Sequence, residues 1–500
     1  MRHNRSMISP MRSPRRLMLS SALLLALSGA ARAQDEEVKV KTLAPPDYFS
    51  GPAAETGLPS DLWKGTAPGL MREALPRLAA GKPLSPAFAS LARRVLATGA
   101  NGPAGVGDDV EMGAARGLAL IALGEAKGAD AILDRATGAA GSSALSMATA
   151  EAALITGADD KACRVEEGLT VDRGAAYWLR LRAFCQLKAG QADAAQLTFQ
   201  LAQQQTAKSG GADADYARLM GAALAGTPPG AANLKTGVNY ALSRRLNLDV
   251  QSAAALATAS PALKAALAPP PAELAEVGRD LTAAEASDLA FLRQAKTTPA
   301  FVEAARAAAP SIAALAQAGA PLRDPVLFAR AAVAAGDPAS AQAIRGRMTQ
   351  DVIPGATTTD LAILDAVIAA ASGKVDDQVL NNLVGRGATG GAKSPGQAAA
   401  VLLSSLGGAM DADARTQFAA FDLGRPAASA ARVQLLDDAA AAKRKGEAAL
   451  LALSLALDAG ASGPAPVDRA RIARALNRAG LSVDARAVVI EGLLGLAYAK

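Results

Sequence analysis

The sequence predicts an all-α protein built as an α-solenoid, a stack of antiparallel helix hairpins. Three observations predict this fold class. Alanine, the best helix-forming residue, and leucine are abundant, while only 3% of residues are aromatic and β-branched residues are sparse. Glycines recur at a constant interval, since Gly124, Gly157 and Gly190 are equally spaced along the chain. The chain of 500 residues is also too long for one ordinary hydrophobic core, whereas each unit of a repeat protein packs only against its neighbours.

The segment 1–33 has the layout of a secretory signal peptide. Arg12, Arg15 and Arg16 precede the apolar run LMLSSALLLALSG, and ARA precedes Gln34, so we expect cleavage after Ala33. The apolar run is shorter than the roughly 20 residues of a spanning helix. No cysteine follows it for a lipid anchor, and the general secretory route fits better than the twin-arginine route. We therefore expect a periplasmic mature chain without a membrane-spanning segment, with secretion as the second choice.

Removal of this segment changes the charge and the available chemistry. The whole chain has a net charge of +6, but the segment 1–33 contains six arginines and no acidic residue. The mature chain is therefore neutral, and no nucleic acid partner is expected. The single histidine, His3, is also removed. Without histidine, the Ser–His–Asp and Cys–His pairs and His-ligated zinc or haem are excluded, and two cysteines cannot form a thiolate zinc site. We expect no enzyme activity, no cofactor and no metal.

Composition divides the rest of the chain into segments. Residues 34–60 are polar and proline-rich, which predicts an extended or disordered segment. Helical repeats are expected over 61–226, 227–350 and 351–500, with helix breakers such as GTPPG between them. The run GRGATGGAKSPG, at 385–396, predicts a flexible loop between helices. Its GxGxxG and near P-loop spacing lacks the preceding strand that phosphate-binding loops require.

Small residues flank five glycines at fixed offsets. Around Gly190, Ala183 lies seven residues before and Ala195 five residues after. The same offsets give Gly117 and Ala129 at Gly124, Ala150 and Ala162 at Gly157, Ala329 and Ala341 at Gly336, and Ala473 and Ala485 at Gly480. Two helix axes approach to about 8 Å only where side chains are small, and glycine adopts the positive φ that ends a helix. Each glycine therefore predicts the turn of a helix hairpin.

This pattern resembles the tetratricopeptide repeat, a unit of about 34 residues with two antiparallel helices. The resemblance is clearest over 110–205. It implies a right-handed superhelix whose first helices line a concave groove for a protein partner. Another all-helical superhelix is the alternative, because alanine or leucine occupies most aromatic positions of the family and the spacing drifts after Gly226.

The two cysteines are placed to form a disulfide. Cys163 lies in the second helix of one predicted hairpin and Cys185 in the first helix of the next. Both lie about nine residues from the intervening turn, which puts them level on adjacent helices and within the Cα separation that a disulfide needs. An oxidising compartment favours the bond. Two buried free thiols are the alternative, and no CxxC motif indicates a redox centre.

Candidate partner-binding residues are Tyr177, Arg180 and Arg218. Tyrosine and arginine are common hot spots of protein interfaces, and Tyr177 and Arg180 begin the first helix of a hairpin. The alternative is structural, with Trp178 in the core and the arginines solvated.

The expected function is that of a non-enzymatic periplasmic helical-repeat protein that binds or scaffolds a protein partner in the cell envelope. Envelope assembly or support of polysaccharide export would be its setting, and the partner would dock as a helix or an extended peptide. One alternative is a glycan-binding or peptidoglycan-active envelope protein that uses paired carboxylates. The other is a purely structural alanine-rich helical protein.

Overall fold

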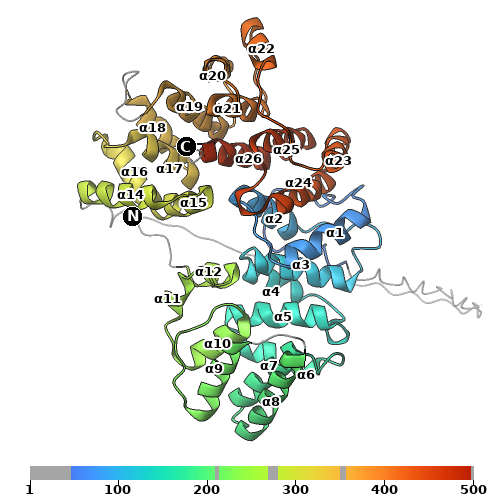
Figure 1. Ribbon diagram of the computed structural model, residues 1–500. Coiled ribbons are helices and arrows are strands. Elements are labelled where there is room, and N and C mark those ends of the chain that lie inside the picture. The colour runs from blue at the N-terminus through green and yellow to red at the C-terminus, as the bar shows by residue number, and fades with distance from the viewer. Residues whose placement is uncertain (1–46, 209–212, 269–279, 349–355, 497–500) are drawn as a thin grey trace, which may run out of the picture. The chain divides into compact units, whose positions relative to one another are not determined.

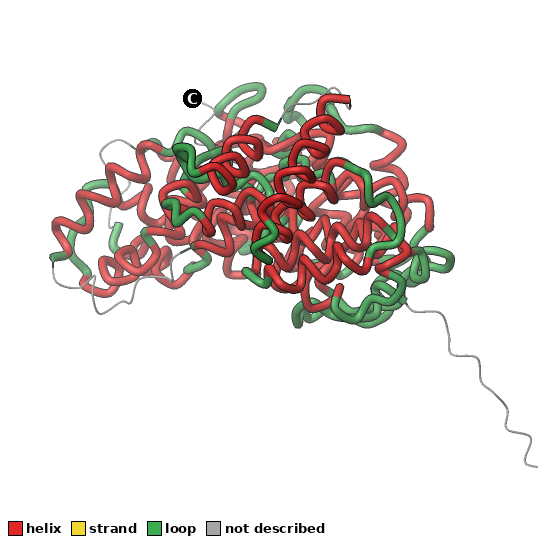
Figure 2. Tube along the Cα trace, turned by 90° about the horizontal axis from the view of Figure 1, so that it is seen from below, coloured by secondary structure: helices red, strands yellow, loops and turns green. Residues whose placement is uncertain are grey.

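Helices account for all regular structure in the described part of the chain. The computed structural model describes residues 47–208, 213–268, 280–348 and 356–496, and these ranges contain 25 α-helices and no strand (Figures 1 and 2). The all-α prediction is confirmed. The predicted signal peptide and residues 34–46 lie outside the described residues. No helix within the described ranges is long and apolar enough to cross a bilayer.

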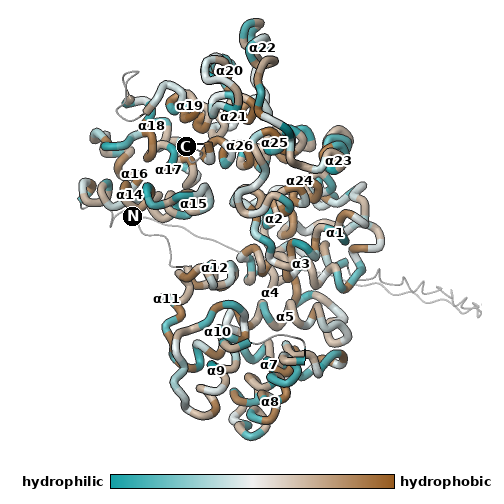
Figure 3. Tube along the Cα trace, in the orientation of Figure 1, coloured by the Kyte–Doolittle hydropathy of each residue, from teal (hydrophilic) through white to brown (hydrophobic). Residues whose placement is uncertain are grey.

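The first half of the chain holds the hairpins that the glycine spacing predicts. Its helices are α1 (Pro68–Ala79), α2 (Pro86–Ala97), α3 (Val110–Ala122), α4 (Ala126–Leu133), α5 (Ser143–Thr156), α6 (Asp159–Gly168), α7 (Ala176–Lys188), α8 (Ala192–Lys208), α9 (Ala214–Ala225), α10 (Gly237–Arg245), α11 (Val250–Ala254) and α12 (Pro261–Leu267), with a 3-10 turn at Ala139–Gly141. The pairs α3–α4, α5–α6 and α7–α8 each pack together. Figure 3 shows hydrophobic and hydrophilic residues mixed over these helices, and most residues of α3 and α5 are buried.

The second half continues with α14 (Leu281–Gln294), α15 (Thr298–Ala307), α16 (Ala309–Ala318), α17 (Pro325–Ala335), α18 (Pro338–Gly346), α19 (Thr358–Ser372), α20 (Asp377–Thr389), α21 (Pro395–Ser404), α22 (Ala412–Ala419), α23 (Ala430–Ala441), α24 (Lys445–Ala459), α25 (Pro466–Ala479) and α26 (Ser482–Gly495), with a 3-10 turn at Gly460–Ser462. Neighbouring helices again pack in pairs, among them α17–α18, α19–α20, α23–α24 and α25–α26.

The five predicted turn glycines and their flanking small residues lie where the hairpin helices meet. Gly124, Gly157, Gly190, Gly336 and Gly480 all have φ between 78° and 92°. The nine flanking alanines are fully buried: Ala129, Ala150, Ala162, Ala183, Ala195, Ala329, Ala341, Ala473 and Ala485. At the remaining position, Gly117, an added Cβ would lie 3.0 Å from the Leu133 side chain. The steric explanation of the spacing is therefore confirmed for these hairpins.

The last helix departs from a simple stack of hairpins. Besides its partner α25, α26 packs against α2, α15, α17, α19 and α21. Figure 1 shows these helices around it. Val488, Val489, Leu493 and Leu494 of α26 are all buried. Because α1 and α2 also pack against α24, helices from the two ends of the described chain share one core.

Buried carboxylates join the first helices to the last ones. Neither α1 nor α2 has a side-chain N-cap of its own. Instead, Glu447 of α24 accepts the Ala67 N–H at 2.9 Å, and Glu491 of α26 accepts the Ala87 N–H at 2.5 Å. The second oxygen of Glu491 accepts a hydrogen bond from Arg469 at 2.7 Å. Carboxylates from the end of the chain thus satisfy the N–H groups that begin its first helices.

The described part of the segment 34–60 is irregular but packed. From residue 47 it forms turns without helix, and the Phe49 side chain is fully buried. The buried Arg116 guanidinium donates to main-chain carbonyls of this segment, among them that of Tyr48 at 2.7 Å, and to two carbonyls at the end of α2. Burial lowers the pKa of Arg116 to about 10. One arginine therefore fixes this segment onto α2 and α3.

The predicted loop at 385–396 is wrong for its first residues, because α20 continues to Thr389. Its glycines serve close helix packing instead. An added Cβ on Gly387 would lie 3.1 Å from the carbonyl carbon of Gly396, and one on Gly396 would lie 3.0 Å from the Cα of Gly387. Without side chains at these positions, the main chains of α20 and α21 come into contact.

Substitution of Glu491 tests the junction between the ends of the chain. Glu491→Ala leaves the Arg469 guanidinium, 5% exposed, without its carboxylate and removes the cap of α2. We expect the free energy of unfolding to fall by about 3–5 kcal/mol, as for other buried ion pairs that lose one partner. Denaturant unfolding followed by circular dichroism measures this.

The matched control is Asp437→Ala, which removes an exposed ion pair with Arg471 at 3.9 Å. Its effect should stay below about 1 kcal/mol. Equal effects of the two substitutions would contradict the structural role of Glu491.

Candidate functional site

A hollow of about 570 Å³ lies where several helices of the second half begin or end. We call it the arginine hollow, after the four arginines that line it: Arg293, Arg323, Arg330 and Arg386. The first turns of α17, α19 and α21 face it, together with the last turn of α20 and Leu496 beyond α26. It is therefore built by segments that are distant in the sequence, from the end of α14 to the end of α26.

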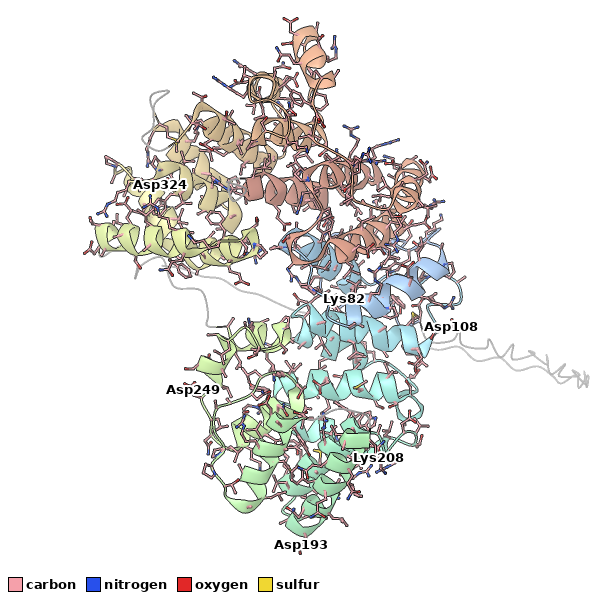
Figure 4. The ribbon with its side chains drawn as sticks, in the orientation of Figure 1. Lys82, Asp108, Asp193, Lys208, Asp249 and Asp324 are labelled. Atoms are coloured by element: carbon pink, nitrogen blue, oxygen red, sulfur yellow. A yellow bond between two sulfur atoms is a disulfide. The ribbon has the colours of Figure 1, made fainter. Side chains whose placement is uncertain are left out.

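Local sequence makes three helices start at this hollow. Their N-cap residues are Asp324, Thr357 and Ser394, and each side chain accepts the N–H of the third residue along, at 3.1, 3.1 and 3.4 Å. Asp324, labelled in Figure 4, marks the start of α17. Proline occupies the first position of α17 and α21, where its missing N–H leaves no bond unmade. Each helix start adds partial positive charge to the hollow.

The four arginines differ in how they are held. Arg293 forms an ion pair with Asp324 at 2.9 Å but is 59% exposed. Arg323 is 60% exposed and lies 3.8 Å from the Glu285 carboxylate. Arg386 is exposed at the end of α20. Arg330 lies deeper and donates to the Leu494 carbonyl at 2.6 Å. Three guanidinium groups are thus within reach of solvent and of a ligand.

Positive charge exceeds negative charge in the lining. Asp324 and Asp360 are its carboxylates, so four arginines leave an excess of two positive charges. Both carboxylates act in helix caps, since Asp360 also accepts the Thr357 N–H at 2.9 Å. The lining also holds apolar side chains, namely the half-buried Val326 and Leu327 and the buried Ile363 and Leu496. The arrangement can hold an anionic group beside an apolar one.

The described residues contain no group of three or more His, Cys, Asp or Glu side chains arranged to hold a metal ion.

Tyr177, predicted to bind a partner, lies at the start of α7 with its ring 4.9 Å from that of Trp178. Its buried hydroxyl lies beside Glu151 of α5, whose carboxylate accepts the N–H of Gly237 at 2.9 Å. Burial raises the pKa of Glu151, and burial with the neighbouring carboxylate raises the pKa of Tyr177. Helix α10 therefore begins against the Glu151 side chain.

The other two predicted residues take part in separate contacts. Arg180 pairs with Asp213 at 2.8 Å and lies over the Tyr216 ring, 5.5 Å from its centroid, in a small hollow between α8 and α9. Arg218 donates to the Pro229 carbonyl and lies 3.5 Å from a carboxylate one turn earlier. Of the three, only Arg180 lines that hollow. Their binding of a partner stays a prediction.

Cys163 and Cys185 form a disulfide with a Cα separation of 5.6 Å, as predicted. The bond joins α6, the second helix of one hairpin, to α7, the first helix of the next. It therefore fixes two successive hairpins to each other.

Sequence reasoning missed the arginine hollow. Its only local signals are the runs DP, TTTD and SP, in which a capping residue precedes a helix, and arginines near them. Such runs predict where helices start. They do not predict that three starts face one hollow, because that depends on how distant helices pack.

No family model matches the chain, and no curated protein or solved structure matches it either. The tetratricopeptide resemblance therefore rests on residue spacing alone.

Removal of the disulfide should destabilise the protein. The double substitution Cys163→Ala, Cys185→Ala opens a loop with a sequence separation of 22, and loops of this size give about 3 kcal/mol of stabilisation. Thermal unfolding should show a lower Tm for the double variant, and reduced wild-type protein should match it. Unchanged unfolding after reduction would show that the bond does not form in the native chain.

Glu151→Gln should change how stability depends on pH. Since burial raises the pKa of Glu151 in the folded state, the folded state binds this proton more tightly than the unfolded one. The stability that the protonated Glu151 contributes is fully present below the ordinary glutamate pKa of 4.5. It is lost as the pH rises through the raised pKa of the folded state. The variant should therefore gain stability relative to wild type between pH 4 and pH 7. Denaturant unfolding at both pH values checks this, and a constant difference would contradict it.

Proposed function

We propose that this chain is an exported, non-enzymatic helical-repeat protein that binds or scaffolds a protein partner in the cell envelope. The observation that carries the proposal is the arginine hollow, which combines accessible guanidinium groups with an apolar wall. Arginine and apolar side chains around a concave surface are typical of protein interfaces. We further propose that the hairpins from α3 to α8 stack as a right-handed, tetratricopeptide-like superhelix.

Export to the periplasm is supported by two features. The segment 1–33 carries the basic, apolar and small-residue regions of a signal peptide in that order. The disulfide between Cys163 and Cys185 needs an oxidising compartment to persist. Neither feature depends on the other.

A binding role rather than an enzymatic one is supported by the side chains present. His3 is the only histidine, and it lies within the predicted signal peptide. In the arginine hollow, Asp324 and Asp360 accept hydrogen bonds from helix starts, which leaves them poorly placed for acid–base work on a ligand.

Crosslinking in the native envelope tests the proposed function. The chain would be expressed as wild type and as the double variant Arg323→Glu, Arg386→Glu, and crosslinked proteins identified by mass spectrometry. We expect a small set of envelope proteins with the wild type and at least a tenfold loss with the variant, because two cations become anions in the hollow.

The matched control is Arg164→Glu, Arg474→Glu, since both arginines are exposed and lie outside the hollow. It should capture the same proteins as the wild type. A third variant, Tyr177→Ala, Arg180→Ala, tests the face predicted from the sequence. If the hollow variant and the control capture the same set, the hollow does not bind the partner, and a set lost only with the third variant would move the site to α7.

A further inference from the structure

Resting on the proposed function, we infer that the arginine hollow binds an acidic peptide segment in which two carboxylate side chains flank an apolar one. The ligand is thus defined by charge, by shape and by an apolar contact.

The charge of the lining matches two carboxylates. Four arginines and two aspartates leave two positive charges in excess. Arg323 and Arg386 are exposed, and their planar guanidinium groups suit bidentate contact with carboxylates. Arg323 forms an ion pair with Glu285 at 3.8 Å, which is longer than a hydrogen bond, so a ligand carboxylate would replace a weak, exposed ion pair and no hydrogen bond.

The helix starts add to this charge. Helices α17, α19 and α21 have 11, 15 and 10 residues, and their first turns all face the hollow. A carboxylate near a helix N-terminus is stabilised by the helix dipole. The arginines are an independent source of positive charge, since three of them lie outside these first turns and only Arg330, within α17, belongs to one of the three helices.

The apolar wall distinguishes a peptide from a purely charged ligand. Val326, Leu327, Ile363 and Leu496 lie in the same lining as the arginines. A hydrophobic side chain between two acidic ones would cover this wall while the carboxylates meet the guanidinium groups. The volume of about 570 Å³ lies within the usual range of ligand sites.

A short labelled peptide tests the inference. Fluorescence anisotropy would follow the peptide SGSELEGSGS, labelled with fluorescein, as the full mature chain is added at low salt. We expect saturable binding that weakens with added salt. SGSQLQGSGS, without the two side-chain carboxylates, and SGSEGEGSGS, without the leucine, should each bind at least tenfold more weakly.

The double variant Arg323→Glu, Arg386→Glu should lose binding at least tenfold, while Arg164→Glu, Arg474→Glu should bind like the wild type. Circular dichroism establishes that both variants are folded. The single variant Arg386→Gln removes one charge at an exposed position and should weaken binding less than the double variant does. Two competitors identify other ligand classes: inorganic phosphate and polygalacturonate, an anionic glycan.

The inference is overturned if SGSELEGSGS does not bind, if the hollow variant binds it as well as the wild type, or if SGSEGEGSGS binds equally well. It is also overturned if phosphate or polygalacturonate displaces the peptide at a lower concentration than unlabelled peptide does. Loss of peptide binding with retained partner capture would overturn this inference alone. Retained peptide binding without any partner captured in the envelope would overturn the proposed function instead.

Discussion

Carboxylates that cap helix starts from distant parts of the chain are the interaction on which the rest of the structure depends. Glu447 and Glu491 cap α1 and α2, Glu151 caps α10, and Glu285 accepts the N–H of Arg323 at 2.7 Å just before α17. The alanine-rich helices bury little apolar area each, and many of their contacts resemble one another. A buried carboxylate is more selective about its partner. Leaving either the carboxylate or the helix N–H buried without a hydrogen bond costs free energy. These contacts therefore fix which helices meet.

The arginine hollow is a consequence of the same packing. Glu285 holds the chain at the start of α17, and contact between Gly387 and Gly396 places the start of α21 against the end of α20. Helix α26 packs against α17, α19 and α21 together, so their first turns are held near one another. A surface with partial positive charges then forms without any local basic cluster in the sequence. Arg293 of α14 and Arg386 of α20 line it together, although five helices lie between α14 and α20.

The two halves of the chain differ in what they offer a ligand. In the first half, α10 begins against Glu151, which lies beside Tyr177, and the disulfide ties α6 to α7. These contacts stabilise the hairpins around α7. In the second half, Arg293, Arg323 and Arg386 of the arginine hollow are exposed. Local charge can differ from net charge, because four arginines and two aspartates line the hollow whatever the charge of the rest of the chain.

The sequence alone determined the helical class, the turns of five hairpins and the disulfide. These depend on short-range rules: glycine ends a helix, alanine permits close contact, and two cysteines level on neighbouring helices can bond. Only the tertiary structure decided that α26 lies against α2, that Gly387 serves helix contact rather than a loop, and that Arg323 and Arg386 share one hollow. The physical reason is that the packing of one alanine face against another is weakly specific. Partners far apart in the sequence are chosen by buried charges whose pairing no local pattern reveals.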